Sequence, residues 1–304
     1  MTRPRSLLRA ALAACLLFAA PLLRAAPLEV VASFSILGDL VGRVGGERVA
    51  VTTLVGPDAD AHNYQPRPSD ARRLGNARLV VANGLGFDPW VERLARSAGY
   101  RGRLLIASSG IRPLPADEDD GHGHGKGAVD PHAWQDIANT IRYVANIADA
   151  LGQADPGGAA TYRDNAARYT AELKALDATI RDTLATVPAE RRKVVSSHDA
   201  FGYFSHAYDI RFVAAAGISN QSEPSATGIA QLIRQLRREQ AAVVFVENVS
   251  DPRLVERIGK ESGARPGGTL YSDALSDAGG PASTYVEMMR HNLKTLMEGL
   301  PRGK

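Results

Sequence analysis

Cysteine is almost absent from this sequence. The 304-residue chain contains one cysteine, Cys15, which lies in a leader segment that we expect to be cleaved. A mature protein without cysteine has no disulfide, no thiolate nucleophile and no cysteine-based zinc site. Any metal ion that the protein binds must therefore be held by histidine, aspartate or glutamate side chains.

A basic surface is absent as well. The formal net charge is +3, but four of the 36 basic residues are arginines that precede residue 26, and without them the chain has 32 basic against 33 acidic residues. Such a balance lacks the cationic footprint that phosphate backbones require, so we expect no nucleic-acid partner. With 44% hydrophobic and 23% charged residues, the composition also excludes a disordered, collagen-like or multi-span membrane protein.

The first 25 residues have the pattern of a secretory signal peptide. Arginines at positions 3, 5 and 9 precede an apolar stretch at 10–23 that is too short to span a bilayer, and small residues follow it. We expect cleavage after Ala25. The segment 12–15 (LAAC) resembles a bacterial lipoprotein box, but the apolar run continues beyond the cysteine, where a lipoprotein normally turns polar. We therefore expect a periplasmic protein without a lipid anchor.

Common catalytic motifs are also missing. The chain has no HExxH, G-x-S-x-G or P-loop sequence, and the glycines at 84 and 86 lack the third glycine of a dinucleotide fingerprint. Together with the signal peptide, these absences favour an external binding protein over an enzyme.

Short β-branched runs alternate with helical patterns from residue 28 onward, which indicates an α/β protein with parallel sheets. The runs form two groups that are separated by a long helical segment. We therefore predict two lobes, each with a mostly parallel sheet flanked by helices. The predicted strands are 28–33, 49–55, 79–83 and 103–107 in the first group, and 193–197, 211–215, 242–247 and a weaker one at 269–271 in the second.

The segment 157–187 carries one continuous apolar stripe at helical spacing. A helix of about 30 residues is roughly 45 Å long, which is more than a lobe of this size needs internally. We predict a rigid backbone helix that joins both lobes, with an ordinary amphipathic crossover helix as the alternative. The expected division is a signal peptide at 1–25, an N-terminal lobe at 26–156, the linking helix at 157–187 and a C-terminal lobe at 188–304.

Three histidines occupy positions that face a cleft in open α/β proteins, just beyond a predicted strand or before a predicted helix. His62 lies in a proline-rich loop, His132 directly follows a proline, and His198 comes directly after a predicted strand. Imidazoles presented on stiff loops from distant parts of the chain are what a zinc site requires. Asp273 and Glu247 are candidates for a fourth ligand, although a helix N-cap and a buried hydrogen-bonded carboxylate are their respective alternatives.

One segment has a biased composition. Residues 117–127 read DEDDGHGHGKG and include no apolar residue, so we expect a mobile surface loop. Its histidines, His122 and His124, are too mobile to form a tight site. They suit weak collection of a metal ion that then passes inward.

Six segments carry a resemblance to a known family, and they occur in the family's order: HNYQPRPSD, DPHAWQD, SSHDAFGYFSHAYDI, GISNQSEPSATGI, VFVENVSDPRLVERI and LYSDALSD. They resemble the metal-binding solute receptors of bacterial ABC importers, the zinc and manganese receptors grouped as cluster A-I. The resemblance covers essentially the whole chain after the leader. It implies two α/β lobes bridged by one long helix, with a metal ion in the cleft between them. It also implies that His62 and His132 from the first lobe and His198 and Asp273 from the second are the ligands, with Glu247 beside them.

The resemblance further implies a periplasmic receptor, a monomer and not an enzyme, that delivers its metal ion to an inner-membrane permease with a separate ATPase. Manganese receptors of the family tend to carry glutamate where this chain has His198, and a third imidazole suits Zn²⁺ better than Mn²⁺. Zinc is therefore the expected ligand, with manganese as the alternative. A periplasmic zinc metallochaperone of the same fold and a secreted zinc hydrolase are the remaining hypotheses.

Overall fold

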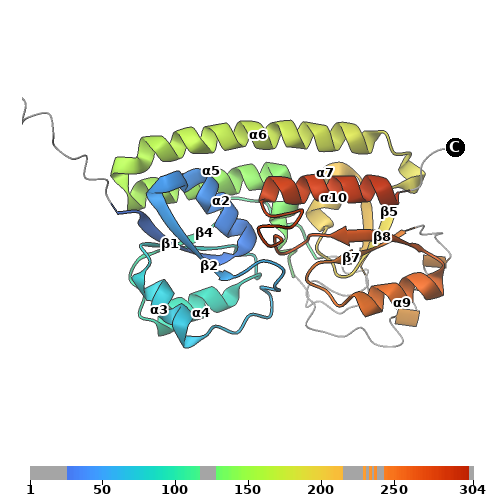
Figure 1. The fold of residues 1–304 in the computed structure, drawn as a ribbon, viewed down its shortest axis with the longest axis horizontal. Coiled ribbons are helices and arrows are strands. Elements are labelled where there is room, and N and C mark those ends of the chain that lie inside the picture. The colour runs from blue at the N-terminus through green and yellow to red at the C-terminus, as the bar shows by residue number, and fades with distance from the viewer. Residues whose placement is uncertain are drawn as a thin grey trace, which may run out of the picture.

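The computed structural model describes residues 26–116, 128–214, 229–230, 233–234, 236–237 and 243–300. Two parallel four-stranded sheets lie at the centres of two lobes, and one long helix, α6 (Ala159–Ala185), runs along both lobes (Figure 1). The predicted fold class is thereby confirmed. The leader and the 117–127 segment, with its two histidines, lie outside the described residues.

The first sheet has the strand order β2-β1-β3-β4, and every neighbouring pair is parallel. Its central strands are apolar and buried, because helices cover both faces of a parallel sheet built from strand-helix-strand units. The elements are β1 (Leu28–Phe34), α2 (Ser35–Gly45), β2 (Val49–Val55), α3 (Pro68–Asn76), β3 (Leu79–Ala82), α4 (Pro89–Ser97), β4 (Arg103–Ile106) and α5 (Ile137–Ala154).

The second sheet has the order β6-β5-β7-β8 and repeats the pattern of the first, again with parallel neighbours. The strand predicted at 269–271 exists but begins earlier, since it runs from Arg265 to Leu270. The elements after α6 are β5 (Lys193–Ser196), α7 (Gly202–Tyr208), β6 (Arg211–Ala214), β7 (Val243–Glu247), α9 (Pro252–Ser262), β8 (Arg265–Leu270) and α10 (Tyr285–Gly299).

Helix α6 is bonded to both lobes. It has 27 residues, so it is about 40 Å long, slightly shorter than the predicted segment. Near its start, Asn165 donates a hydrogen bond to the carbonyl of Val44 in α2, over 2.8 Å. Near its end, Asp177 accepts a hydrogen bond of 2.8 Å from Tyr208 in α7. The residues of its apolar stripe are buried: Tyr162, Ala166, Tyr169, Leu173, Leu176, Ile180 and Leu184.

The assignment of 188–304 to a single lobe stays a prediction. The last helix, α10, packs against α2 and α6 as well as against β8. At its start, the backbone N–H of Tyr285 donates to the carboxylate of Asp39 in α2, over 2.9 Å. The C-terminal part of the chain is therefore anchored on the first lobe too.

Candidate metal centre

His62 lies in the loop that follows β2. Its backbone N–H donates to the carboxylate of Asp60 over 2.8 Å, which fixes the turn that presents the histidine. The ring of Phe87 packs edge-on against the imidazole, with the two ring centroids 4.4 Å apart. The side chain of His62 is 6% exposed, whereas the other three residues of the centre are fully buried.

His132 lies between β4 and α5, and the carboxylate of Asp130 holds it at two points. Oδ1 of Asp130 accepts a hydrogen bond of 2.8 Å from the backbone N–H of His132. The same oxygen lies 2.7 Å from Nδ1 of the imidazole. With Nδ1 engaged in this way, Nε2 is the nitrogen that remains for a metal ion.

His198 comes two residues after β5, and Glu247 at the end of β7 holds it in the same manner. Oε1 of Glu247 accepts a hydrogen bond of 2.9 Å from the backbone N–H of His198. Oε2 lies 2.6 Å from Nδ1 of the ring. Glu247 therefore contacts the far side of this imidazole and lies outside the four-residue cluster.

Asp273 follows β8, in a loop that is bonded to the first lobe. The indole N–H of Trp134 and the side-chain amide of Gln135 each donate to the carbonyl of Ser272 over 2.9 Å. The backbone N–H of Leu275 donates to the hydroxyl of Ser35, also over 2.9 Å. Although it comes late in the chain, Asp273 is thus fixed by contacts with residues that precede α6.

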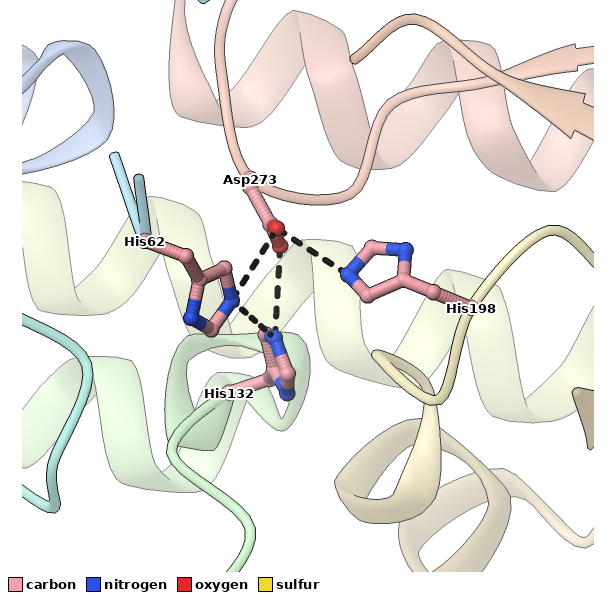
Figure 2. Close-up of side chains that lie close together, drawn as sticks. All are labelled: His62, His132, His198 and Asp273. Atoms are coloured by element: carbon pink, nitrogen blue, oxygen red, sulfur yellow. Dashed lines mark hydrogen bonds and ion pairs between the residues drawn. The ribbon is translucent and has the colours of Figure 1, made fainter. Parts of the chain in front are cut away.

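The four side chains converge on one point (Figure 2). One ligand atom from each residue can be chosen so that all four atoms lie within 4.8 Å of one another. Oδ2 of Asp273 is 3.1 Å from Nε2 of His198 and 3.4 Å from Nε2 of His62. Oδ1 is 3.6 Å from Nε2 of His132, and the Nε2 atoms of His62 and His132 are 3.1 Å apart.

Neighbouring carboxylates raise the pKa of two of these histidines. Burial by itself lowers the pKa of His132, but the charges of Asp273 and Asp130 outweigh burial, so the pKa is above its usual value. Burial also lowers the pKa of His198, but the carboxylates of Glu247 and Asp273 outweigh burial and raise the pKa well above its usual value. Both imidazoles therefore hold protons more tightly than a free histidine does.

The pKa values of the other two residues, His62 and Asp273, are lowered. For His62 burial dominates, so its pKa is lowered even though Asp273 lies beside it. Burial raises the pKa of Asp273, but the imidazoles of His198 and His132 outweigh burial and bring the pKa well below its usual range. The centre thus contains an ionised carboxylate and at least one neutral imidazole at neutral pH.

Such a centre has the chemistry to bind a divalent cation. Three imidazole nitrogens and a carboxylate are the donors found in zinc sites, and they surround one point. Among the described residues, Oδ1 of Asp273 is buried and accepts no hydrogen bond. A buried carboxylate oxygen without a hydrogen bond is unfavourable unless a cation is bound beside it. That these four residues are metal ligands nevertheless stays a prediction.

A cleft of about 600 Å³ lies beside His62 and opens to solvent. His62 lines this cleft and is the most exposed member of the centre, so the cleft lies beside the side of the centre that is nearest to solvent. The lining residues are His62, Asn63, Tyr64, Gln65, Pro89, Trp90 and Arg93.

The remaining histidines of the described segments lie elsewhere. His206 is exposed on α7, and His291 lies on α10, where Nε2 is 3.0 Å from the carbonyl oxygen of Thr269. Asp130 was missed from the sequence. A signal for it exists, because a D-x-H pattern occurs at both Asp60 and Asp130, and in both places the carboxylate accepts a hydrogen bond from the histidine backbone.

The chain is similar to known metal-binding proteins. Residues 30–299 match the family described as zinc-uptake complex component A, periplasmic (ZnuA). The manganese-binding lipoprotein MntA of Halalkalibacterium halodurans is 35% identical over 90% of this chain and 88% of its own. The iron-binding protein YfeA of Yersinia pestis is 33% identical over 89% of this chain and 86% of its own. Among solved structures, the periplasmic zinc-binding protein TroA of Treponema pallidum has a TM-score of 0.83 and 30% identity, and the match covers 91% of this chain and 100% of that chain.

The expectation that the protein lacks a lipid anchor is wrong. MntA is named a lipoprotein, and so are further relatives such as SsaB of Streptococcus sanguinis. The expectation depended on the apolar run after Cys15 and gave too little weight to the LAAC box, which contains the cysteine that a lipoprotein box requires. Within the described part of the chain, no helix combines the length and the apolar character needed to cross a bilayer.

Proposed function

Because the chain belongs to the ZnuA family, whose members are substrate-binding receptors of metal ABC transporters, we propose that it captures Zn²⁺ outside the cytoplasmic membrane and delivers it to a permease with a separate ATPase. The observation that carries the proposal is the convergence of three imidazoles and one carboxylate from both halves of the chain. In this function the metal ion is the transported substrate and takes no part in catalysis.

The family consists of receptors, so the secreted zinc hydrolase is set aside. The geometry agrees with that conclusion. A hydrolytic zinc site has three protein ligands and a position for water, whereas four protein donors surround a single point here. A periplasmic metallochaperone remains the alternative to an importer receptor, since it would use the same centre and differ only in its partner protein.

The choice of zinc over manganese is supported by the donor set. Three neutral nitrogens and a single carboxylate suit Zn²⁺, whereas Mn²⁺ prefers more oxygen donors. The names of the relatives differ on this point, since MntA is named for manganese, YfeA for iron and TroA for zinc. Manganese is therefore the alternative ligand. Both oxygens of Asp273 face the cluster, so this carboxylate could bind Mn²⁺ in a bidentate manner.

Replacing His198 by glutamate is expected to lower the Zn²⁺ to Mn²⁺ affinity ratio at least about tenfold, which is 1.4 kcal/mol. The substitution exchanges a neutral nitrogen for a carboxylate, which favours a harder ion with more ligands. The new carboxylate would lie against Glu247, so the double variant His198→Glu with Glu247→Gln removes that repulsion. Chelator competition with each metal measures the ratio, and the exposed His206→Glu is the matched control. An unchanged ratio in both variants contradicts the role given to His198.

Deleting the 117–127 segment is expected to leave one tight zinc equivalent and to remove a weaker one. None of its residues is a proposed ligand, and His122 and His124 are the ones expected to collect metal ions weakly. The deletion is structurally simple because the flanking residues already meet, with the N–H of Ala116 donating to the carbonyl of Ala128 over 3.0 Å. Titration calorimetry counts the two classes of site. Loss of the tight equivalent would mean that the segment supplies a true ligand.

Uptake in the source organism tests the biological role. Deletion of the gene is expected to reduce accumulation of radioactive zinc in a zinc-limited medium, and a plasmid copy is expected to restore it. A plasmid copy with His132→Ala is expected to fail. If manganese uptake falls instead, the zinc assignment is wrong, and if neither uptake changes, the metallochaperone is favoured.

A further inference from the structure

Two carboxylates hold two of the proposed ligands in the same way. Asp130 and Glu247 each accept a hydrogen bond from the backbone N–H of a histidine and each contact Nδ1 of the same ring. Glu247 uses one oxygen for each contact, whereas Asp130 uses Oδ1 for both. The second oxygen of Asp130, Oδ2, is therefore available for a different contact.

That contact is with Gly202, the first residue of α7. A Cβ atom added to Gly202 would lie 2.4 Å from Oδ2 of Asp130, about 1 Å closer than an ordinary contact. Leu114 also links the segment that contains Asp130 to helix α7, through two hydrogen bonds. The backbone N–H of Asp130 donates to the carbonyl of Leu114 over 3.0 Å, and the N–H of Leu114 donates to the hydroxyl of Tyr203 over 3.0 Å.

The two partners come from different halves of the chain. Asp130 precedes the long helix α6 and holds a ligand of the first half, while Gly202 lies only four residues after His198, a ligand of the second half. The start of α7 thus limits where the Asp130 carboxylate can lie. The carboxylate in turn sets the orientation of the His132 ring.

We propose that Asp130 is a positioning residue of the metal centre and that the absence of a side chain at Gly202 allows it to hold His132 with Nε2 toward Asp273. The proposal depends on the metal-binding function argued above. An alanine at 202 leaves no space for Oδ2 where it now lies, so the carboxylate must move, and the ring that it holds must turn with it. A ring turned away from the centre is a poorer ligand, because the angles at the metal are set by the ring orientation.

A double-mutant cycle tests this coupling. Asp130→Ala is expected to lower zinc affinity about 10- to 100-fold, the range typical of residues that orient a histidine ligand. Gly202→Ala is expected to lower it about tenfold in the parent, and to have almost no further effect in the Asp130→Ala background, because the clashing carboxylate is gone. Equal effects of Gly202→Ala in both backgrounds overturn the proposal. Gly42→Ala in α2 is the matched control, since nothing lies within 4 Å of its added Cβ.

The visible spectrum of the Co²⁺-substituted protein separates positioning from general destabilisation. Gly202→Ala is expected to weaken or shift the tetrahedral Co²⁺ bands while the melting temperature of the metal-free protein stays near the parent value. Unchanged bands together with a lowered melting temperature would show a merely structural role. If the parent itself binds no zinc at a site that depends on His132, then the proposed function fails; if the parent binds and the cycle is additive, only this inference fails.

Discussion

Replacing His132 by alanine is expected to reduce zinc affinity more than about a hundredfold. Structural zinc sites bind with roughly 10–16 kcal/mol shared among four ligands, so one ligand is worth about 3 kcal/mol. His132 is fully buried, so its substitution by alanine also removes packed side-chain atoms from the centre. The substitution also leaves the carboxylate of Asp130 buried without the imidazole that it holds.

Competition with a chelator of known affinity measures this loss on the purified mature protein. His206→Ala is the control, since this histidine is exposed on α7 and lies outside the centre. The melting temperature of each metal-free variant shows whether it has folded. A folded His132→Ala protein that binds zinc as tightly as the parent would mean that the proposed centre is not the metal site.

The two sheets were predictable from the sequence because most strands are β-branched apolar runs. Strands β1, β3, β5 and β7 are mostly buried, and their alternation with helical segments indicates parallel order without any knowledge of tertiary contacts. Only the end of the eighth strand was predicted, and its first four residues were missed. Its sequence, Arg-Pro-Gly-Gly-Thr-Leu, contains the residues that strand propensity excludes.

Tertiary packing explains why β8 forms despite this sequence. It lies at the edge of the sheet, where a proline is tolerated because one side needs no hydrogen-bond donor. A Cβ atom at Gly267 would lie 2.4 Å from the ring of Phe245 in β7, so the glycine is needed for this aromatic side chain to pack. Such a requirement depends on a residue 22 positions away and has no local signal in the sequence.

The positions of the four proposed ligands were predictable for a different reason. Each follows a predicted strand or precedes a predicted helix, and the carboxyl ends of parallel strands share one edge of a sheet. The hydrogen bonds that hold the ligand loops in place were not predictable. The bonds from Trp134 and Gln135 to the Asp273 loop join residues more than 130 positions apart, and only the folded chain reveals them.

Zinc binding is expected to release between one and two protons at neutral pH and to tighten as the pH rises. The carboxylates raise the pKa of His132 and His198 above the usual value, so the metal-free protein holds protons there that a metal ion must displace. His62, with its lowered pKa, is already neutral and adds none. Where both raised histidines are protonated, affinity rises up to about a hundredfold per pH unit.

The stability of the metal-free protein is expected to follow the opposite trend. A histidine whose folded pKa is raised stabilises the fold fully below its unfolded pKa of about 6.5, and this contribution is lost as the pH rises through the folded pKa. Asp273, whose pKa is lowered, contributes fully above about pH 3.9 and loses its contribution as the pH falls through the folded pKa. His132, His198 and Asp273 therefore contribute most to the stability of the metal-free fold between these limits, whereas burial lowers the pKa of His62, so this histidine disfavours the fold below about pH 6.5.

Zinc should consequently raise the melting temperature more at pH 8 than at pH 6, because the ion replaces protons that are bound tightly at the lower pH. Calorimetry in buffers of different ionisation enthalpy counts the protons released, and His132→Ala is expected to release fewer, by at most one, because the imidazole with the raised pKa is gone. His206→Ala should match the parent. Zinc affinity that is constant from pH 6 to pH 8, with no proton released, would contradict the assignment of His132 and His198 as the protonated ligands.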